Sequence, residues 1–187
     1  RSNMDKFIIN SQDSLLLVID IQEKLFKVME EDIQGILKKN TEILMKTAKE
    51  FNIPVIITEQ YRKGLGTTIP ELANICSCPN LEKTFFNCMK DETIAKELKA
   101  AGKKNILIAG IESHICVLQT TLSLLNDGYN VIVACDAVAS RRKSDWQAAM
   151  KVLEKAGAVI YPTETIAFMI LEKSGTEQFK RLSPLFK

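Results

Sequence analysis

Short apolar runs alternate along this chain with longer segments in which apolar residues recur at helical spacing. The short runs predict buried strands at residues 15–19, 55–57, 81–86, 106–110, 131–134 and 158–160. The longer segments predict helices at residues 33–51, 91–101, 115–125, 144–155, 163–171 and 176–182. Residues 59–79 contain two glycines and two prolines and form too long a connection for a plain turn, so we expect a functional loop there.

This alternation predicts an α/β fold. Strands that are apolar without interruption, separated by helices, are typical of a parallel sheet covered on both faces. We therefore expect a three-layer α/β/α domain with a doubly wound, mainly parallel, Rossmann-like sheet. We expect one domain over residues 4–187, because residues 1–3 before Met4 are typical of residues left by cloning.

The composition narrows the functional classes. Hydrophobic residues make up 46% of the chain, charged residues 26%, and the formal net charge is +2. Such a small excess, with no basic stripe, argues against nucleic-acid binding. No apolar run is long enough to span a membrane. The sequence shows no secretory signal pattern and its five cysteines are expected to be free thiols, which favours a cytoplasmic location.

Three residues with reactive side chains lie within or directly after three different predicted strands. Asp20 ends strand 15–19, Lys83 lies in the segment 81–86, and Cys116 opens the helix after strand 106–110. Ligands bind beyond the carboxyl ends of strands in such sheets, so these side chains should face one crevice.

Each of the three residues also has an ordinary structural interpretation. A free cysteine is usually a small buried hydrophobe, a strand-terminal aspartate often caps a turn, and most lysines are exposed. However, a cysteine at a helix N-terminus should have a lowered pKa and rest as the nucleophilic thiolate. His114 lies only two positions from Cys116 and faces elsewhere on a helix, so the expected base is Asp20.

The sequence around these residues resembles the isochorismatase-like cysteine hydrolases. The similar segments are residues 17–22, 81–86 and 109–117, which read LVIDIQ, LEKTFF and AGIESHICV. The resemblance covers nearly the whole domain and implies that Asp20, Lys83 and Cys116 are the catalytic residues. Residues 58–61, 63–66 and 69–72 resemble the branch that contains isochorismatase domain-containing protein 2 and proteins called MAR1 ribonucleases. The ribonuclease label fits poorly, because the chain lacks a histidine pair.

The resemblance also implies a mechanism. Cys116 would attack a carbonyl carbon, and the backbone N–H groups of Glu112 and Cys116 would hold the oxyanion. A cis peptide bond is expected between Ile111 and Glu112. The attack would give a thioester intermediate, which water would then hydrolyse. An amide or related C–N bond is favoured over an ester as the bond that is cleaved.

A departure from the family pattern concerns metals. Nicotinamidases of this family hold a metal through histidines after the second strand, where this chain reads TEQY at residues 58–61. We therefore expect no metal, no cofactor and no nicotinamidase activity. Gln60 is expected to contact substrate instead, and Gln22, Phe26 and Tyr61 to line the pocket.

The remaining cysteines are expected to have no part in the hydrolase chemistry. Cys76 and Cys78 are separated by one residue, which is too close for a structural zinc site and would strain a disulfide between them. Cys88 and Cys135 are interpreted as buried apolar residues.

Two alternative functions stay open at this stage. One is a catalytically idle family member that acts as a binding or scaffold protein. The other is a redox-responsive protein in which Cys116 is oxidised reversibly. For the enzyme, the resemblance implies a small-molecule substrate and a homo-oligomer.

Overall fold

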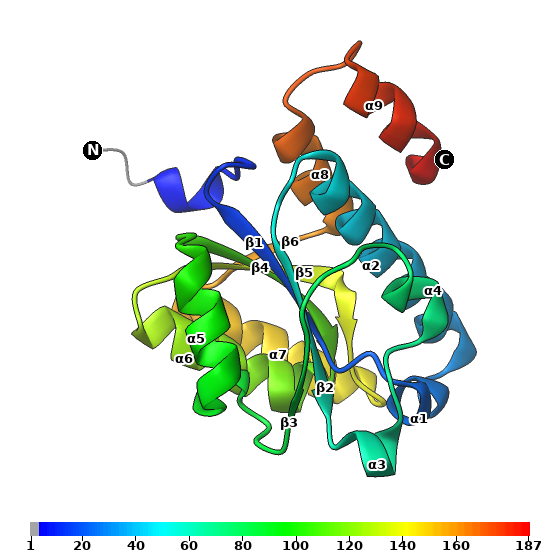
Figure 1. Ribbon diagram of the computed structural model, residues 1–187, viewed down its shortest axis with the longest axis vertical. Helices are drawn as coiled ribbons and strands as arrows, with labels where there is room; N and C mark the ends of the chain where they lie inside the picture. The colour runs from blue at the N-terminus through cyan, green and yellow to red at the C-terminus, as the bar shows by residue number, and fades with distance from the viewer. Residues whose placement is uncertain (1–3) are drawn as a thin grey trace.

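The computed structural model describes residues 4–187, so the expectation for residues 1–3 lies outside the described residues. Its centre is a parallel sheet with the strand order β3-β2-β1-β4-β5-β6 (Figure 1). The strands are β1 (Ser14–Ile19), β2 (Val55–Gln60), β3 (Asn80–Lys83), β4 (Asn105–Ile111), β5 (Asn130–Ala139) and β6 (Val159–Tyr161). Every strand pair is parallel, which confirms the predicted doubly wound α/β/α fold.

Helices cover both faces of the sheet. The helices are α1 (Glu23–Lys27), α2 (Glu31–Glu50), α3 (Arg62–Leu65), α4 (Pro70–Ala73), α5 (Glu92–Ala101), α6 (Leu118–Asn126), α7 (Lys143–Ala156), α8 (Thr163–Leu171) and α9 (Glu177–Leu182). Three 3₁₀ turns cover Asp5–Phe7, Cys88–Lys90 and Ser183–Phe186, and a π-helical turn covers Ser113–Val117. In Figure 1, α2 and α4 lie on one side of the sheet, and α5, α6 and α7 lie on the other.

The two layers follow from the alternation of side chains along each strand. In β1, Leu16 and Val18 join the core beneath α2, α4 and α8, whereas Leu15, Leu17 and Ile19 join the core beneath α5, α6 and α7. All six residues of β1 are buried, as expected for a central strand covered on both faces.

The structure corrects several predicted boundaries. β3 ends at Lys83, so residues 84–86 do not continue the strand as predicted. The segment 59–79 is not a continuous loop, because it begins with the end of β2 and contains the short helices α3 and α4. A π-helical turn precedes α6, so the α-helix predicted from residue 115 begins at Leu118.

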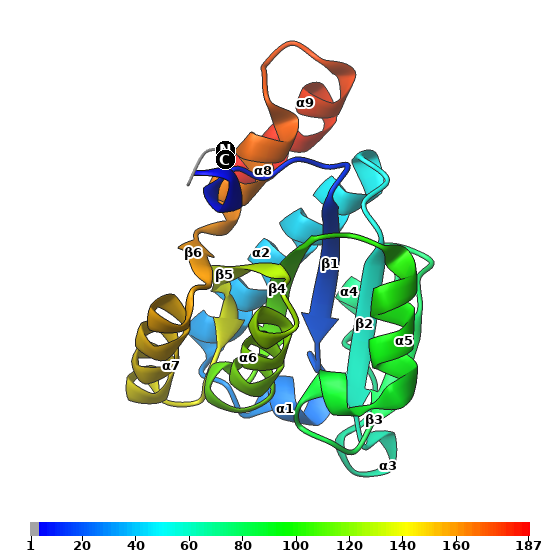
Figure 2. The ribbon, with the colours of Figure 1, turned by 90° about the vertical axis from the view of Figure 1, so that its left-hand side faces the viewer.

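The order of strands determines where a site can form. The chain runs from β1 outward through β2 to β3, and then returns to place β4 on the other side of β1. This reversal makes a crevice at the carboxyl ends of β1 and β4. In Figure 2 the arrowhead of β1 points toward this edge, where α1 and α3 also lie.

Candidate active site

Asp20 lies at the carboxyl end of the central strand β1 and is fully buried. Its φ of 53° is in the left-handed region, which aspartate tolerates better than most residues but which still carries a cost. Its N–H donates to Thr58 O at 3.0 Å, and its Oδ1 accepts a hydrogen bond from Thr58 Oγ1 at 2.8 Å. β2 therefore fixes both the backbone and the carboxylate of Asp20.

Lys83 is the last residue of β3, and its ammonium reaches across β2 to Asp20. The Nζ atom lies 2.8 Å from Asp20 Oδ2, 2.6 Å from Gln60 Oε1 and 3.3 Å from Phe86 O. The side chains of Lys83 and Asp20 are both 0% exposed. Burial lowers the pKa of Lys83, but the Asp20 charge and hydrogen bond outweigh this and raise it overall. The ammonium is therefore a permanent charge of the site.

Cys116 completes the group from the other side of β1. It lies in the π-helical turn after β4, with Sγ 3.6 Å from Lys83 Nζ, and only 6% of the residue is exposed. The structure thus brings Asp20, Lys83 and Cys116 together, although Asp20 and Cys116 are almost a hundred positions apart in the sequence.

The pKa of Cys116 lies above the ordinary thiol value, which is the opposite of the direction expected from the sequence. Burial is the largest cause, and the negative charge of Asp20 and a hydrogen bond with it act in the same direction. The Lys83 ammonium lowers the pKa but does not compensate for these effects. The free protein therefore holds Cys116 as a thiol in contact with a carboxylate.

The segment between β4 and Cys116 has an unusual backbone. The Ile111–Glu112 peptide bond is cis, at the position that the family resemblance implies. Glu112 is buried, and its Oε2 accepts hydrogen bonds from Arg141 N at 2.9 Å and Arg141 Nε at 3.0 Å. These bonds join the backbone beside Cys116 to the end of β5.

Gln22 and Gln60, which are expected to contact substrate, both make hydrogen bonds within the protein. Gln22 is 0% exposed, and its amide bonds to the backbone of Gln60, with Oε1 accepting from Gln60 N at 2.6 Å and Nε2 donating to Gln60 O at 2.8 Å. Gln60 uses Oε1 for Lys83 Nζ and donates from Nε2 to Thr84 O at 2.7 Å. Gln60 therefore holds the Lys83 ammonium directly, and Gln22 holds the backbone of Gln60.

Aromatic side chains lie near this edge of the sheet. Phe26 is partly buried against the core, which fits a wall position. Tyr61, directly after β2, is 50% exposed. Phe85 and Phe86, two and three residues after Lys83, are 51% and 54% exposed.

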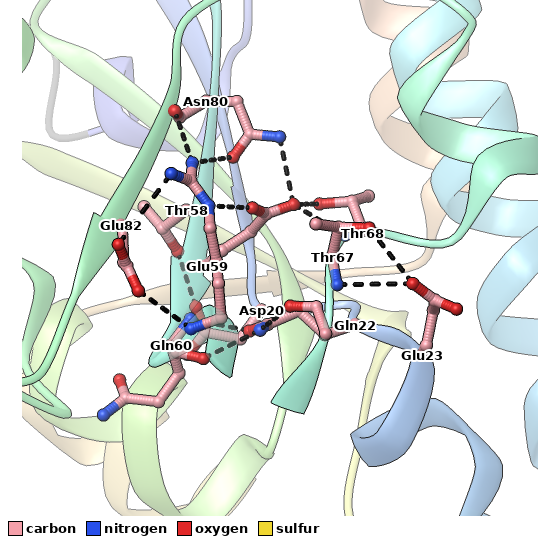
Figure 3. Close-up of polar contacts among 12 residues, drawn as sticks. Asp20, Gln22, Glu23, Thr58, Glu59, Gln60, Thr67, Thr68, Asn80 and Glu82 are labelled. Carbon is pink, nitrogen blue, oxygen red and sulfur yellow. Dashed lines mark hydrogen bonds and ion pairs between the residues drawn. The ribbon is translucent and has the colours of Figure 1, made fainter. Parts of the chain in front are cut away.

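A second polar cluster, centred on Glu59, was not found from the sequence (Figure 3). Glu59 is 1% exposed, and its Oε2 accepts from Thr68 N and Thr68 Oγ1 at 2.6 Å each and from Asn80 Nδ2 at 3.0 Å. Its Oε1 lies 2.6 Å from Arg62 Nε. These bonds tie the end of β2 to α3 and to the start of β3. The only signal in the sequence was the polar run 58–60 at the end of a buried strand.

Neither a metal-binding cluster nor a membrane-spanning helix is present among the described residues. Within residues 4–187, no three histidine, cysteine, aspartate or glutamate side chains are grouped so that they could hold a metal ion. Over the same range, no helix is both long and apolar enough to cross a bilayer.

Comparison with known proteins identifies the family to which this chain belongs. The model of the isochorismatase domain matches residues 14–165. The chain belongs to the isochorismatase family. It is 38% identical to isochorismatase family protein 1A of Dictyostelium discoideum over 92% of this chain and 85% of that protein. Isochorismatase domain-containing protein 2 of Danio rerio is 31% identical, with 95% and 88% covered. The secreted isochorismatase effector Isc1 of Phytophthora sojae is 33% identical, with 93% and 84% covered.

Solved structures of isochorismatase-family proteins have the same fold. The MAR1 ribonuclease of Caenorhabditis elegans is 37% identical with a TM-score of 0.87, and the match covers 95% of this chain and 91% of that one. YcaC of Escherichia coli, described as an octameric hydrolase of unknown specificity, is 27% identical with a TM-score of 0.88 and coverages of 95% and 90%. YcaC of Pseudomonas aeruginosa, solved with hexane-2,5-diol and covalent acrylamide, is 27% identical with a TM-score of 0.90 and coverages of 95% and 91%. The expected branch, with isochorismatase domain-containing protein 2 and MAR1-like structures, is confirmed.

Proposed function

We propose that this protein is a cysteine hydrolase that cleaves a small carbonyl compound, with Cys116 as nucleophile, Asp20 as base and Lys83 as the stabilising cation. The observation that carries the proposal is the position of Lys83 Nζ, which contacts Asp20 Oδ2 at 2.8 Å and Cys116 Sγ at 3.6 Å. A nucleophile within reach of its base, with an adjacent fixed charge, is the arrangement that covalent catalysis requires.

The raised pKa of Cys116 determines how the first step proceeds. The thiol keeps its proton until a substrate carbonyl is in place, and Asp20 takes that proton as the S–C bond forms. Negative charge then moves from sulfur to the carbonyl oxygen, where the backbone N–H groups of Glu112 and Cys116 would hold it. Lys83 remains charged throughout and stabilises the anions that form beside it.

The later steps release the amine and regenerate the thiol with a proton from water. Asp20 gives its proton to the leaving nitrogen, the C–N bond breaks, and an acyl group remains on Cys116 as a thioester. Asp20 then takes a proton from a water molecule that attacks the thioester. The C–S bond then breaks, Asp20 passes that proton to the sulfur of Cys116, and the acid product leaves, so one water is consumed for each bond cleaved.

The substrate class follows from the nucleophile and its surroundings. A sulfur nucleophile suits an acyl carbon, and we favour amides and related C–N bonds over esters. The related YcaC of Pseudomonas aeruginosa carries covalent acrylamide, and acrylamide adds nucleophiles across its C=C bond, so that protein has a reactive nucleophile. Tyr61, Phe26, Gln22 and Gln60 are proposed as residues that line the substrate pocket, and Gln60 also holds the Lys83 ammonium through its Oε1.

Several further expectations belong to this proposal. The donor groups at residues 58–61 include no histidine, so we propose chemistry without a metal. We propose a homo-oligomer, because YcaC of Escherichia coli is described as octameric. A cytoplasmic location stays a prediction, because the relative Isc1 is described as secreted. For this chain we favour hydrolysis of a small carbonyl compound over the cleavage of RNA that the name of the MAR1 proteins implies.

A substrate screen with matched variants tests the function. Small amides and esters are incubated with the wild type, with Cys116→Ala and with Cys135→Ala as the control for loss of a thiol remote from Asp20. We expect hydrolysis by the wild type and the control, loss of activity in Cys116→Ala, and an acyl adduct on Cys116 when turnover is stopped with acid. Activity should survive a chelator.

Three other outcomes of this screen would contradict the proposal. Hydrolysis that survives Cys116→Ala would refute the nucleophile assignment. Binding of the panel compounds with no turnover by any form would favour the idle scaffold. Reversible oxidation of Cys116 without hydrolysis would favour the redox function assigned to that residue.

A further inference from the structure

A second pair of reactive groups lies at the opposite edge of the sheet from Asp20. The segment between α4 and β3 carries Cys76 and Cys78, both partly exposed. Their Sγ atoms are 3.5 Å apart, and Cys78 Sγ lies 3.8 Å from Cys76 O. The structure therefore holds two thiols in direct contact, far from the site proposed for hydrolysis.

This pair lines a substantial cavity of about 660 Å³. The cavity lies at the amino ends of β1 and β2, since Leu15 and Val55 form part of its wall. Its two charged lining residues are Lys49 and Glu97. Such a volume can admit a small oxidant or reductant, and both sulfurs border the space.

The surroundings make the two sulfurs unequal. The contact with Cys78 lowers the pKa of Cys76 to about 7, burial opposes this change, and the nearby Lys49 charge supports it. Lys49 is held close by a hydrogen bond from its Nζ to Ile75 O at 3.3 Å. The pKa of Cys78 is raised by the same contact and by burial. Cys78 Sγ also has Cys76 O as a possible acceptor at 3.8 Å, and the Lys49 charge acts on Cys76, so Cys76 is the better placed of the two sulfurs to act as the thiolate.

The other thiols lack this activation. Burial raises the pKa of Cys88 to about 11, and it also raises the pKa values of Cys116 and Cys135. Oxidants react with thiolates, so susceptibility should follow the thiolate fraction and exposure. The redox function considered for Cys116 is therefore better supported at Cys76.

We propose that Cys76 and Cys78 form a reversible dithiol–disulfide pair that hydroperoxides oxidise. The Cys76 thiolate attacks a peroxide oxygen, an S–O bond forms, the O–O bond breaks, and the leaving hydroxide takes up a proton. The Cys78 thiol then attacks the sulfenic acid, an S–S bond forms, the S–O bond breaks, and water leaves. Two electrons and two protons pass from the dithiol to the peroxide, which becomes two waters or, from an organic hydroperoxide, water and an alcohol.

The single residue between the cysteines makes this pair suited to a reversible reaction. A disulfide across so short a spacing is strained, and strained, exposed disulfides are the ones that thiols reduce readily. A permanent structural crosslink is therefore not expected. A small dithiol should return the pair to the reduced form.

Peptide mass spectrometry of the whole protein tests the proposal directly. Trypsin releases residues 64–83 as one peptide that contains Cys76 and Cys78 and no other cysteine. The reduced protein is treated with an equimolar amount of hydrogen peroxide, quenched in acid and alkylated. We expect this peptide to lose two hydrogens and resist alkylation, and dithiothreitol to reverse both changes. Cys88, Cys116 and Cys135 should remain alkylatable.

Single variants separate the roles of the two sulfurs. In Cys78→Ser, oxidation should stop at a sulfenic acid on Cys76 that dimedone traps. In Cys76→Ser, the peptide should resist oxidation, and Cys135→Ser should behave as the wild type. The proposal is overturned if residues 64–83 keep both free thiols while another cysteine is oxidised, or if Cys76 passes to a sulfinic acid with Cys78 intact. Neither outcome affects the hydrolase proposal.

Discussion

Replacement of Lys83 by methionine tests the centre of the site through stability as well as activity. Lys83 Nζ and Asp20 Oδ2 are 2.8 Å apart, and both side chains are fully buried. Opposite unit charges at this distance attract by about 6 kcal/mol at an effective dielectric constant of about 20, and desolvation of the two ions offsets much of this. Methionine retains most of the volume but leaves the Asp20 charge buried without a cation, with the Thr58 hydroxyl and the Cys116 thiol as its side-chain donors.

We expect Lys83→Met to lower the free energy of unfolding by about 3–5 kcal/mol, the usual cost of removing one partner from a buried pair. Asp20→Asn should cost less, because the ammonium keeps Gln60 Oε1 at 2.6 Å and Phe86 O at 3.3 Å. The double variant should lose less than the sum of the two, because no unpaired charge then remains.

The control is an exposed pair of the same residue types. Lys104 Nζ lies 3.6 Å from Asp13 Oδ2, with side chains 63% and 42% exposed, so Lys104→Met should cost at most about 1 kcal/mol. Urea unfolding followed by circular dichroism gives the midpoints and slopes for all four variants and the wild type. Equal losses in Lys83→Met and Lys104→Met, or strict additivity in the double variant, would refute the assignment of a coupled buried pair.

Three other predictions concern separate parts of the chain. Gly110→Ala should destabilise the fold by several kcal/mol in the same urea assay, because a Cβ there would lie 2.7 Å from Ile19 Cβ and meet its backbone oxygen, at a φ of 136°. The pKa of Glu59 is lowered because its hydrogen bonds outweigh burial, so its stabilisation is present above about pH 4.3 and is lost as the pH falls through the folded pKa. Urea unfolding at a series of acid pH values should therefore show a smaller acid loss in Glu59→Gln, and an unchanged acid loss would contradict this account. Iodoacetamide at neutral pH should label Cys76, with a pKa of about 7, much faster than Cys116, and the reverse order would show that the activated thiol is at the other edge.

The boundaries that the sequence predicted well are those set by local chemistry. The helix predicted at 91–101 is α5, where the Asp91 side chain accepts a hydrogen bond from Ile94 N and Gly102 ends the helix at a φ of 65°. Both signals are short-range, because a cap involves residues three or four positions apart. The shorter β3 was not predictable in this way, because its length depends on pairing with β2.

The direction of the Cys116 pKa shows the limit of local reasoning in the site. A cysteine at the start of a helix suggested a thiolate, yet burial and the Asp20 charge raise its pKa. Both causes arise from residues brought in by other strands. The same holds for Gln60, whose side chain bonds to Lys83 Nζ and Thr84 O.

The layered α/β/α fold could be predicted from the sequence alone, because hydrophobic periodicity shows which face of each element must be buried. The residues at the strand ends were also predictable as candidates for one site. The contacts among Asp20, Lys83 and Cys116, the direction of the Cys116 pKa shift and the contact of Cys76 with Cys78 beside a cavity became known only from the three-dimensional structure. The physical reason is that a pKa or a hydrogen bond depends on distance and desolvation in space. Those quantities are set by the packing of β1, β3 and the turn after β4. The positions of these segments in the sequence do not give the distances between them in space.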